Sequence, residues 1–114
     1  MYLILALIIL LIVVTAGAGI GFWHVKGNTV PAPLAYIHLT FGAIGAVLLI
    51  LGYMASSGGT MLTLALIFVL AAAAGGLALL FPMRLSGRRA PNFLIFVHGS
   101  AAIAGVASLV VYFL

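Results

Sequence analysis

The amino-acid sequence predicts an all-α fold: an integral-membrane four-helix bundle of up-down-up-down topology, built from two tandem transmembrane hairpins. Composition is the first observation, because 68% of the 114 residues are hydrophobic and only four carry a formal charge. A soluble domain carries about 25% charged residues, so this chain could not cover a folded surface with polar groups in water. The second observation is a series of four long apolar segments, and the third is an internal repeat.

Each apolar segment is long enough to cross a bilayer, which requires roughly 20 apolar residues in a helix. The predicted spans are residues 2–22, 33–54, 60–81 and 92–114. The outer two breaks are the Gly- and Pro-containing stretches HVKGNTVPAP and PMRLSGRRAP, and the middle break is the tight turn SSGG. Such short connections make successive helices antiparallel neighbours. We therefore expect one transmembrane domain that covers residues 1–114.

The first span is expected to be a retained helix rather than a signal peptide. No basic residue precedes its apolar core, and that core is longer than the apolar region of a signal peptide. All the formal charges lie in two loops, as Lys26, Arg84, Arg88 and Arg89. Both loops fall on one side of a four-span protein, and the positive-inside rule predicts that this side is cytoplasmic. Both termini are then on the non-cytoplasmic side, and the basic loops are expected to meet anionic lipid headgroups.

The second half of the chain repeats the first at an offset of 60 residues. Repeat 1 covers about 1–56 and repeat 2 about 60–114, and the match is strong in the loops and the second helix of each repeat. The matching pairs are Gly27/Gly87, Pro31/Pro91, Leu34/Leu94, His38/His98 and Gly45/Gly105. The match is weak between the first and third helices. Because each repeat holds two spans, the repeats share one orientation and a pseudo-twofold axis lies along the membrane normal.

His38 and His98 are the candidate ligands of a cofactor. Each lies about seven residues into its helix, or roughly 10 Å from the helix start at 1.5 Å per residue. If the four helices close in sequence order, the second and fourth helices are diagonal neighbours roughly 11–14 Å apart, given adjacent axes about 8–10 Å apart. Two imidazoles with metal–nitrogen bonds of about 2 Å could span that gap. A b-type haem held by His38 and His98 is therefore the favoured cofactor, and a chlorin pigment with one axial histidine is a variant.

Small residues follow each histidine on the same helix face, where they would leave room for a flat macrocycle. They are Gly42 and Gly45 after His38, and Ala102 and Gly105 after His98. The haem propionates would meet the cationic loop residues, which are Lys26, Arg84, Arg88, Arg89 and also His24. A zinc site is not indicated, because it needs about four ligands.

The same pattern also has a purely structural interpretation. Membrane helices approach one another through small residues at this spacing. Gly17, Gly21 and the run AAAAGG (71–76) follow it with no histidine expected nearby. An intramembrane histidine can instead donate a hydrogen bond to a backbone carbonyl, to Thr40 or to Ser100. A duplication copies a structural histidine as faithfully as a ligand. Trp23 and His24 are expected to form an interfacial anchor.

The sequence contains no cysteine, aspartate or glutamate. Disulfides, thiolate metal sites, carboxylate acid–base catalysis and Mg²⁺ or Ca²⁺ cages are therefore excluded. The chain resembles small four-helix multidrug exporters in size only, because a carboxylate in their first helix is central to them. No nucleic-acid motif is present, and the chain is not expected to be an enzyme. A transporter would have only its histidines to titrate.

The pattern P-x-x-L-x-aromatic-aliphatic-H occurs at Pro31–His38 and at Pro91–His98, each followed by an Ala/Gly-rich helix. It resembles small bacterial four-helix inner-membrane proteins in which each hairpin carries one such histidine. The resemblance covers about half the chain and implies a bacterial inner membrane, but no activity. The two-histidine bundle is also similar in geometry to membrane b-type cytochromes. The sequence thus predicts a small subunit of a larger respiratory or photosynthetic membrane complex; a cofactor-free assembly subunit and, less favoured, a small transporter are the alternatives.

Overall fold

The computed structural model describes the backbone of residues 1–114 and every side chain except those of residues 82 and 83. Its helices are α1 (Tyr2–Val25), α2 (Ala32–Met54), α3 (Thr60–Ala78), the π-helical segment η1 (Leu79–Arg84) and α4 (Asn92–Phe113). Four helical segments, the third of them running through α3 into η1, are long and apolar enough to cross a membrane. The predicted all-α, four-helix fold of a multi-pass membrane protein is confirmed.

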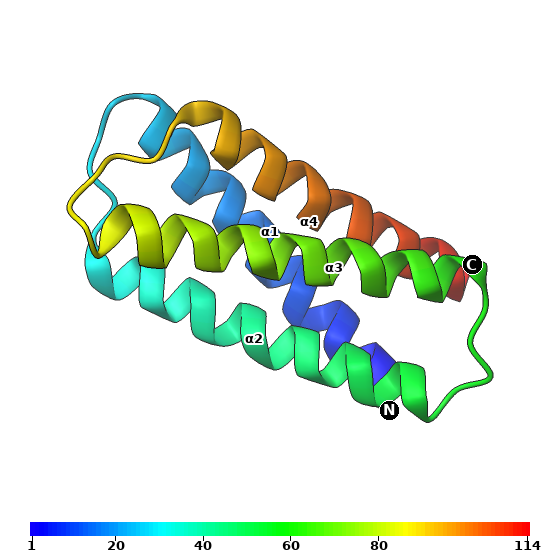
Figure 1. Ribbon diagram of the computed structural model, residues 1–114. Helices are drawn as coiled ribbons and strands as arrows, with labels where there is room; N and C mark the ends of the chain where they lie inside the picture. The colour runs from blue at the N-terminus through cyan, green and yellow to red at the C-terminus, as the bar shows by residue number, and fades with distance from the viewer.

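The four helices run alternately up and down along one axis (Figure 1). The described chain measures 43 × 20 × 20 Å, and its long axis matches the roughly 40–45 Å of a bilayer with its headgroup regions. One end, here called the charged end, carries loops 26–31 and 85–91. The other end, here called the terminal end, carries both chain termini and the turn at 55–59 (Figure 1). All formal charges therefore lie at or beside the charged end.

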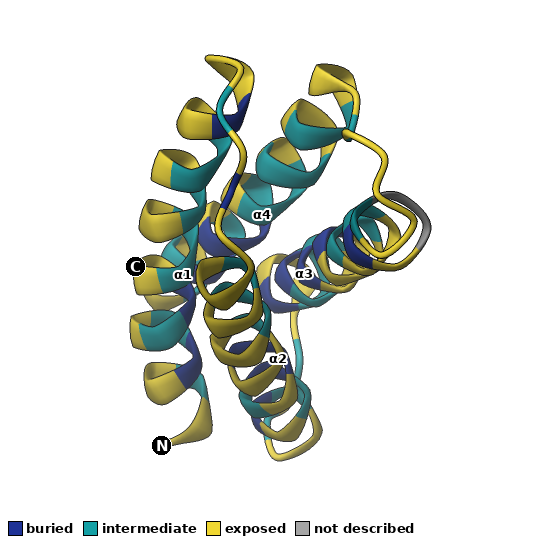
Figure 2. Cartoon of the chain, turned by 90° about the vertical axis from the view of Figure 1, so that its left-hand side faces the viewer, coloured by how far each residue is buried: buried dark blue, intermediate teal, exposed yellow. Residues whose placement is uncertain are grey.

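The bundle consists of two closely packed hairpins. The most extensive helix contacts are those of α1 with α2 and of α3 with α4, while α1–α4 and α2–α3 contacts close the ring. Helices α2 and α4 lie diagonally across the bundle, as predicted from a closure in sequence order. The outward faces of all four helices are apolar and exposed, whereas buried residues face inward (Figure 2). This distribution suits a chain whose solvent is lipid.

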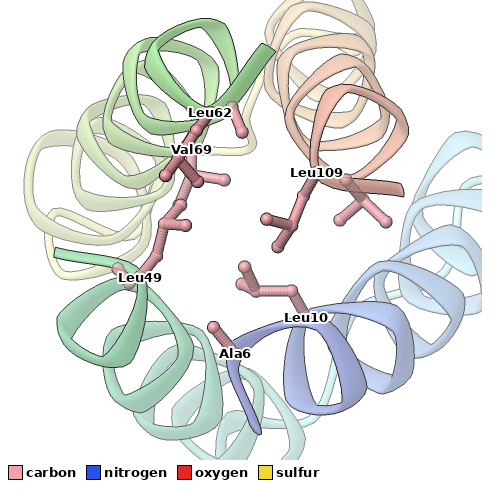
Figure 3. Packing of buried hydrophobic residues seen from close by; sticks show 9 residues of the cluster. Ala6, Leu10, Leu49, Leu62, Val69 and Leu109 are labelled. Carbon is pink, nitrogen blue, oxygen red and sulfur yellow. The ribbon is translucent and has the colours of Figure 1, made fainter. Parts of the chain in front are cut away.

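The close-packed apolar core lies in the half of the bundle nearer the terminal end. Leu49, Leu62 and Leu109 are 0% exposed there and come from three different helices. Leu10 of α1 completes the set, so that the side chains of all four helices meet at the bundle axis (Figure 3). Every member of this core cluster belongs to residues 6–10, 46–49, 62–69 or 106–109. This half of the molecule therefore supplies most of the apolar packing.

Helices α1 and α3 are also repeat-related, but at an offset of 59 rather than 60. This offset pairs Ala6 with Ala65 and Leu10 with Val69, and it gives each pair closely similar burial. The segment η1 explains the change of offset, because a π-helical turn holds one more residue than an α-helical turn. One extra residue rotates an α-helical face by about 100°, which is why the comparison at 60 residues made these two helices look unrelated.

Candidate functional site: a paired-histidine centre

The two histidines lie at equal depth, as predicted. His38 is six residues after the first residue of α2, Ala32, and His98 is six residues after the first residue of α4, Asn92. Pro31 and Pro91 directly precede the two helices and adopt nearly the same extended backbone conformation. Proline tends to occur at such starts, since it has no N–H that would need an intrahelical partner. The repeated proline thus sets the repeated depth.

The imidazole rings meet across the diagonal of the bundle. Their centroids are 6.3 Å apart and their planes are inclined at 79°. Both side chains are half-buried. The structure therefore brings His38 and His98 together at the bundle axis.

Glycines on the neighbouring helices make room for both rings. A Cβ atom on Gly17 of α1 would lie 2.8 Å from Cε1 of His38, and one on Gly76 of α3 would lie 3.2 Å from Cε1 of His98. Gly17 and Gly76 are equivalent at the 59-residue offset. The prediction that the small residues of α1 and α3 are remote from any inward histidine is wrong, because these glycines contact the histidines of the partner helix in each hairpin.

Hydrogen bonding distinguishes the two histidines. Nδ1 of His98 donates to the backbone carbonyl of Ala72 on α3 at 2.8 Å. This bond places the ring hydrogen on Nδ1 and leaves Nε2 as the nitrogen with a free lone pair. Nδ1 of His38 is buried and has no hydrogen-bond partner among the described residues. Thr40 does not serve His38, because its hydroxyl donates to the carbonyl of Tyr36 at 2.8 Å.

The glycines predicted to cradle a macrocycle have other roles. Leu10 packs against Gly45, and its Cδ2 would be 2.7 Å from a Cβ added there. Val69 packs against Gly105, and its Cγ2 would be 2.8 Å from a Cβ added there. These two residues are helix-packing positions, and their assignment as cofactor-binding residues is corrected. Gly42 faces Val13 at an ordinary van der Waals distance of 3.7 Å, and Ala102 is half-buried.

The histidines lie where close packing gives way to a more open half of the bundle. On the charged side of them, several apolar residues are only half-buried, although His24, Val30 and Leu80 are buried there. The half-buried residues are Ile20, Ala35, Leu79 and Leu94. The imidazoles thus stand at the edge of the apolar core and not inside it.

Two reciprocal contacts join the loops of the charged end. Nη2 of Arg84 donates to the carbonyl of Val30 at 2.7 Å, and Nε2 of His24 donates to the carbonyl of Ala90 at 2.9 Å. Residues 24 and 84 are equivalent at the 60-residue offset, and so are residues 30 and 90. Each repeat therefore binds the carbonyl that precedes the helix-starting proline of the other repeat. This is the exchange of contacts that a twofold axis produces.

The other cationic residues only partly match the prediction that they are available to bind haem propionates. Arg89 donates to the carbonyls of His24 and Asn28, and Nζ of Lys26 lies 5.0 Å from the ring centre of Phe22. Arg88 is exposed and also makes a contact within the chain. His24 is 8% exposed, so the prediction that it is an interfacial anchor is wrong; its neighbour Trp23 is exposed and donates to the carbonyl of Thr29 at 3.2 Å.

The donor set fits an iron with two axial ligands and does not fit a site built from protein ligands alone. Among the described residues no three metal-binding side chains gather, whereas two imidazoles suffice where a porphyrin supplies four further nitrogens.

Comparisons with protein-family models, with curated proteins and with solved structures found no match.

Proposed function

We propose that this chain is a small subunit of an energy-transducing complex in a bacterial inner membrane, with His38 and His98 as axial ligands of one b-type haem. The observation that carries the proposal is the 6.3 Å between the ring centres. Two imidazoles bonded through nitrogen to one metal ion have their centres roughly 6 Å apart, given metal–nitrogen bonds of about 2 Å. Such a haem supplies a one-electron carrier in the low-dielectric interior of the membrane.

The surroundings of the pair support this role. A histidine ligand commonly donates its second ring hydrogen to a carbonyl, which orients the ring and raises its basicity, and Ala72 accepts such a bond from His98. Both rings lie on the side of the core where inward residues are half-buried. Without a carboxylate in the chain, no residue pair is available for carboxylate-based proton transfer, so electron transfer is the chemistry that suits this site.

The proposed orientation follows from the charges. The charged end lies on the cytoplasmic side under the positive-inside rule, and both termini lie on the opposite side. Lys26 and Arg88 are exposed there, close to where propionates directed to the cytoplasmic face would need cationic partners.

A visible absorption spectrum of gently purified, haem-replete protein tests the proposal. We expect a Soret band, with sharp α and β bands after reduction by dithionite, and we expect these bands to be absent from a His38→Ala/His98→Ala double variant. A colourless wild-type protein would contradict the proposal. It would leave the histidines with a packing role.

The second candidate is a cofactor-free assembly subunit, and one observation favours it. Gly17 and Gly76 fit closely against the imidazoles, as small residues do where membrane helices pack tightly. In that case the protein would copurify with a larger membrane complex. Replacing both histidines by glutamine would leave that association intact.

A further inference from the structure

We propose that the two histidines are unequal ligands: His98 holds the iron permanently, and His38 is displaced by a neutral diatomic molecule such as carbon monoxide. This inference rests on the proposed function and deepens it. It concerns which ligand the site exchanges and not whether the site exists.

The inequality arises because repeat-related positions make different hydrogen bonds. Ala72, which accepts the bond from Nδ1 of His98, corresponds to Val13 at the 59-residue offset. No such bond reaches His38, since its Nδ1 has no partner among the described residues. The ring of His98 is therefore fixed about its long axis and in its tautomer, while the ring of His38 is held by packing alone.

The strength of the two iron–nitrogen bonds should differ for the same reason. Losing a hydrogen bond behind a metal ligand typically costs about 10- to 100-fold in metal affinity. The imidazole that has the bond is the more basic donor and the better oriented one. His38 is therefore the ligand with the smaller barrier to leaving.

The packing of α1 against α2 defines one position for the His38 ring. Cε1 and Nε2 of His38 lie 2.8 and 3.4 Å from the position that a Cβ atom on Gly17 would occupy. The ring thus rests against the backbone of α1. A methyl group at residue 17 would displace the His38 ring from this position without changing either histidine.

The exchange itself conserves electrons. The bond from ferrous iron to His38 breaks, and its electron pair stays on the imidazole nitrogen. A bond from iron to the carbon of carbon monoxide forms with the lone pair of that carbon. No oxidant or proton is needed. Carbon monoxide binds ferrous and not ferric haem iron, so only reduced protein should react.

The test measures haem content and the carbon monoxide difference spectrum of the dithionite-reduced full chain. We expect His38→Ala to keep its haem and to bind carbon monoxide completely, and His98→Ala to hold haem at least about 10-fold more weakly. Equal behaviour of the two variants, or retention of haem only by His98→Ala, would overturn the inference. A wild-type protein without a Soret band would instead remove the proposed function, and the inference with it.

A second pair of variants avoids deleting a ligand. Gly17→Ala should keep haem and bind carbon monoxide to a greater extent than wild type. Gly19→Ala is the matched control, because a Cβ on Gly19 meets nothing within 4 Å. If Gly17→Ala and Gly19→Ala bind carbon monoxide alike, His38 is not the displaced ligand.

Discussion

Gly45 and Gly105 are repeat-related residues whose missing side chains let the helices of each hairpin approach. A Cβ on Gly45 would meet Cδ2 and Cγ of Leu10 at 2.7 and 2.9 Å. A Cβ on Gly105 would lie 2.8 Å from Cγ2 of Val69 and 3.1 Å from its backbone nitrogen. The end of a leucine side chain can rotate away, but a helix backbone cannot.

We therefore expect Gly105→Ala to destabilise the bundle more than Gly45→Ala. Overpacking of this kind costs about 1–3 kcal/mol, and the higher helix propensity of alanine offsets up to about 1 kcal/mol of that. Thermal unfolding in detergent, followed by circular dichroism, measures the difference. Gly19→Ala is the control and should be neutral or stabilising. A Gly105→Ala protein as stable as this control would show that the close approach of α3 and α4 is not required.

The sequence was sufficient to identify His38 and His98 and their equal depth, because both follow a helix-starting proline by the same interval. It could not distinguish glycines that receive a ring from glycines that receive an aliphatic side chain. Gly17 and Gly45 look alike in sequence, and only the rotation of the partner helix decides that the first faces His38 and the second faces Leu10.

Among the elements, the loops of the charged end are held by the exchanged contacts of His24 with Ala90 and of Arg84 with Val30. The accepting carbonyls precede Pro31 and Pro91, so they lie directly before α2 and α4. These contacts connect the two hairpins at the end of the bundle that lacks the apolar core. They are therefore expected to fix the positions from which the two histidine-bearing helices begin.

Removing either contact should loosen both loops. We expect Arg84→Ala and His24→Ala each to raise the amide hydrogen-exchange rates of residues 26–31 and 85–91, because a lost hydrogen bond of this type costs about 1–3 kcal/mol. Lys26→Gln is the control, because Nζ of Lys26 lies over the ring of Phe22 and takes no part in the exchanged contacts. Unchanged exchange in Arg84→Ala would mean that the Val30 contact does not order the loops.

The four spans and their order could be predicted from apolar length and breaker residues alone. The equivalence of α1 and α3 could not, because the π-helical segment η1 shifts the repeat by one residue near the end of the third span. A repeat search at one fixed offset cannot follow such an insertion. The contacts of Gly17 with His38 and of Gly76 with His98 reveal it, because the two glycines are 59 residues apart whereas the two histidines are 60 residues apart.

For the whole molecule, the absence of cysteine from the sequence makes the proposed orientation easy to test. Thr29 and Ser57 are exposed and lie at opposite ends of the bundle. We expect a membrane-impermeant thiol reagent applied from the non-cytoplasmic side to label Ser57→Cys in intact cells, and to label Thr29→Cys only after the membrane is opened. Labelling of Thr29→Cys in intact cells would reverse the orientation.

The two hairpins together make a site that neither hairpin contains. Each contributes one imidazole at the same depth, and the rings meet at the bundle axis, 6.3 Å apart. A site on a pseudo-twofold axis holds one ligand per chain, not one per repeat. The proposed haem is therefore expected at one per chain because of the fold.

The measurement that tests the central claim most directly is the haem content per chain, determined as the pyridine haemochrome. The wild-type protein should hold one haem per chain, and the His38→Ala/His98→Ala protein should hold none. Thr40→Ala/Ser100→Ala is the matched control, because it alters exposed, repeat-related residues two positions from the histidines, and it should keep one haem per chain. No haem in the wild type, or an unchanged haem content after both histidines are removed, would contradict the account.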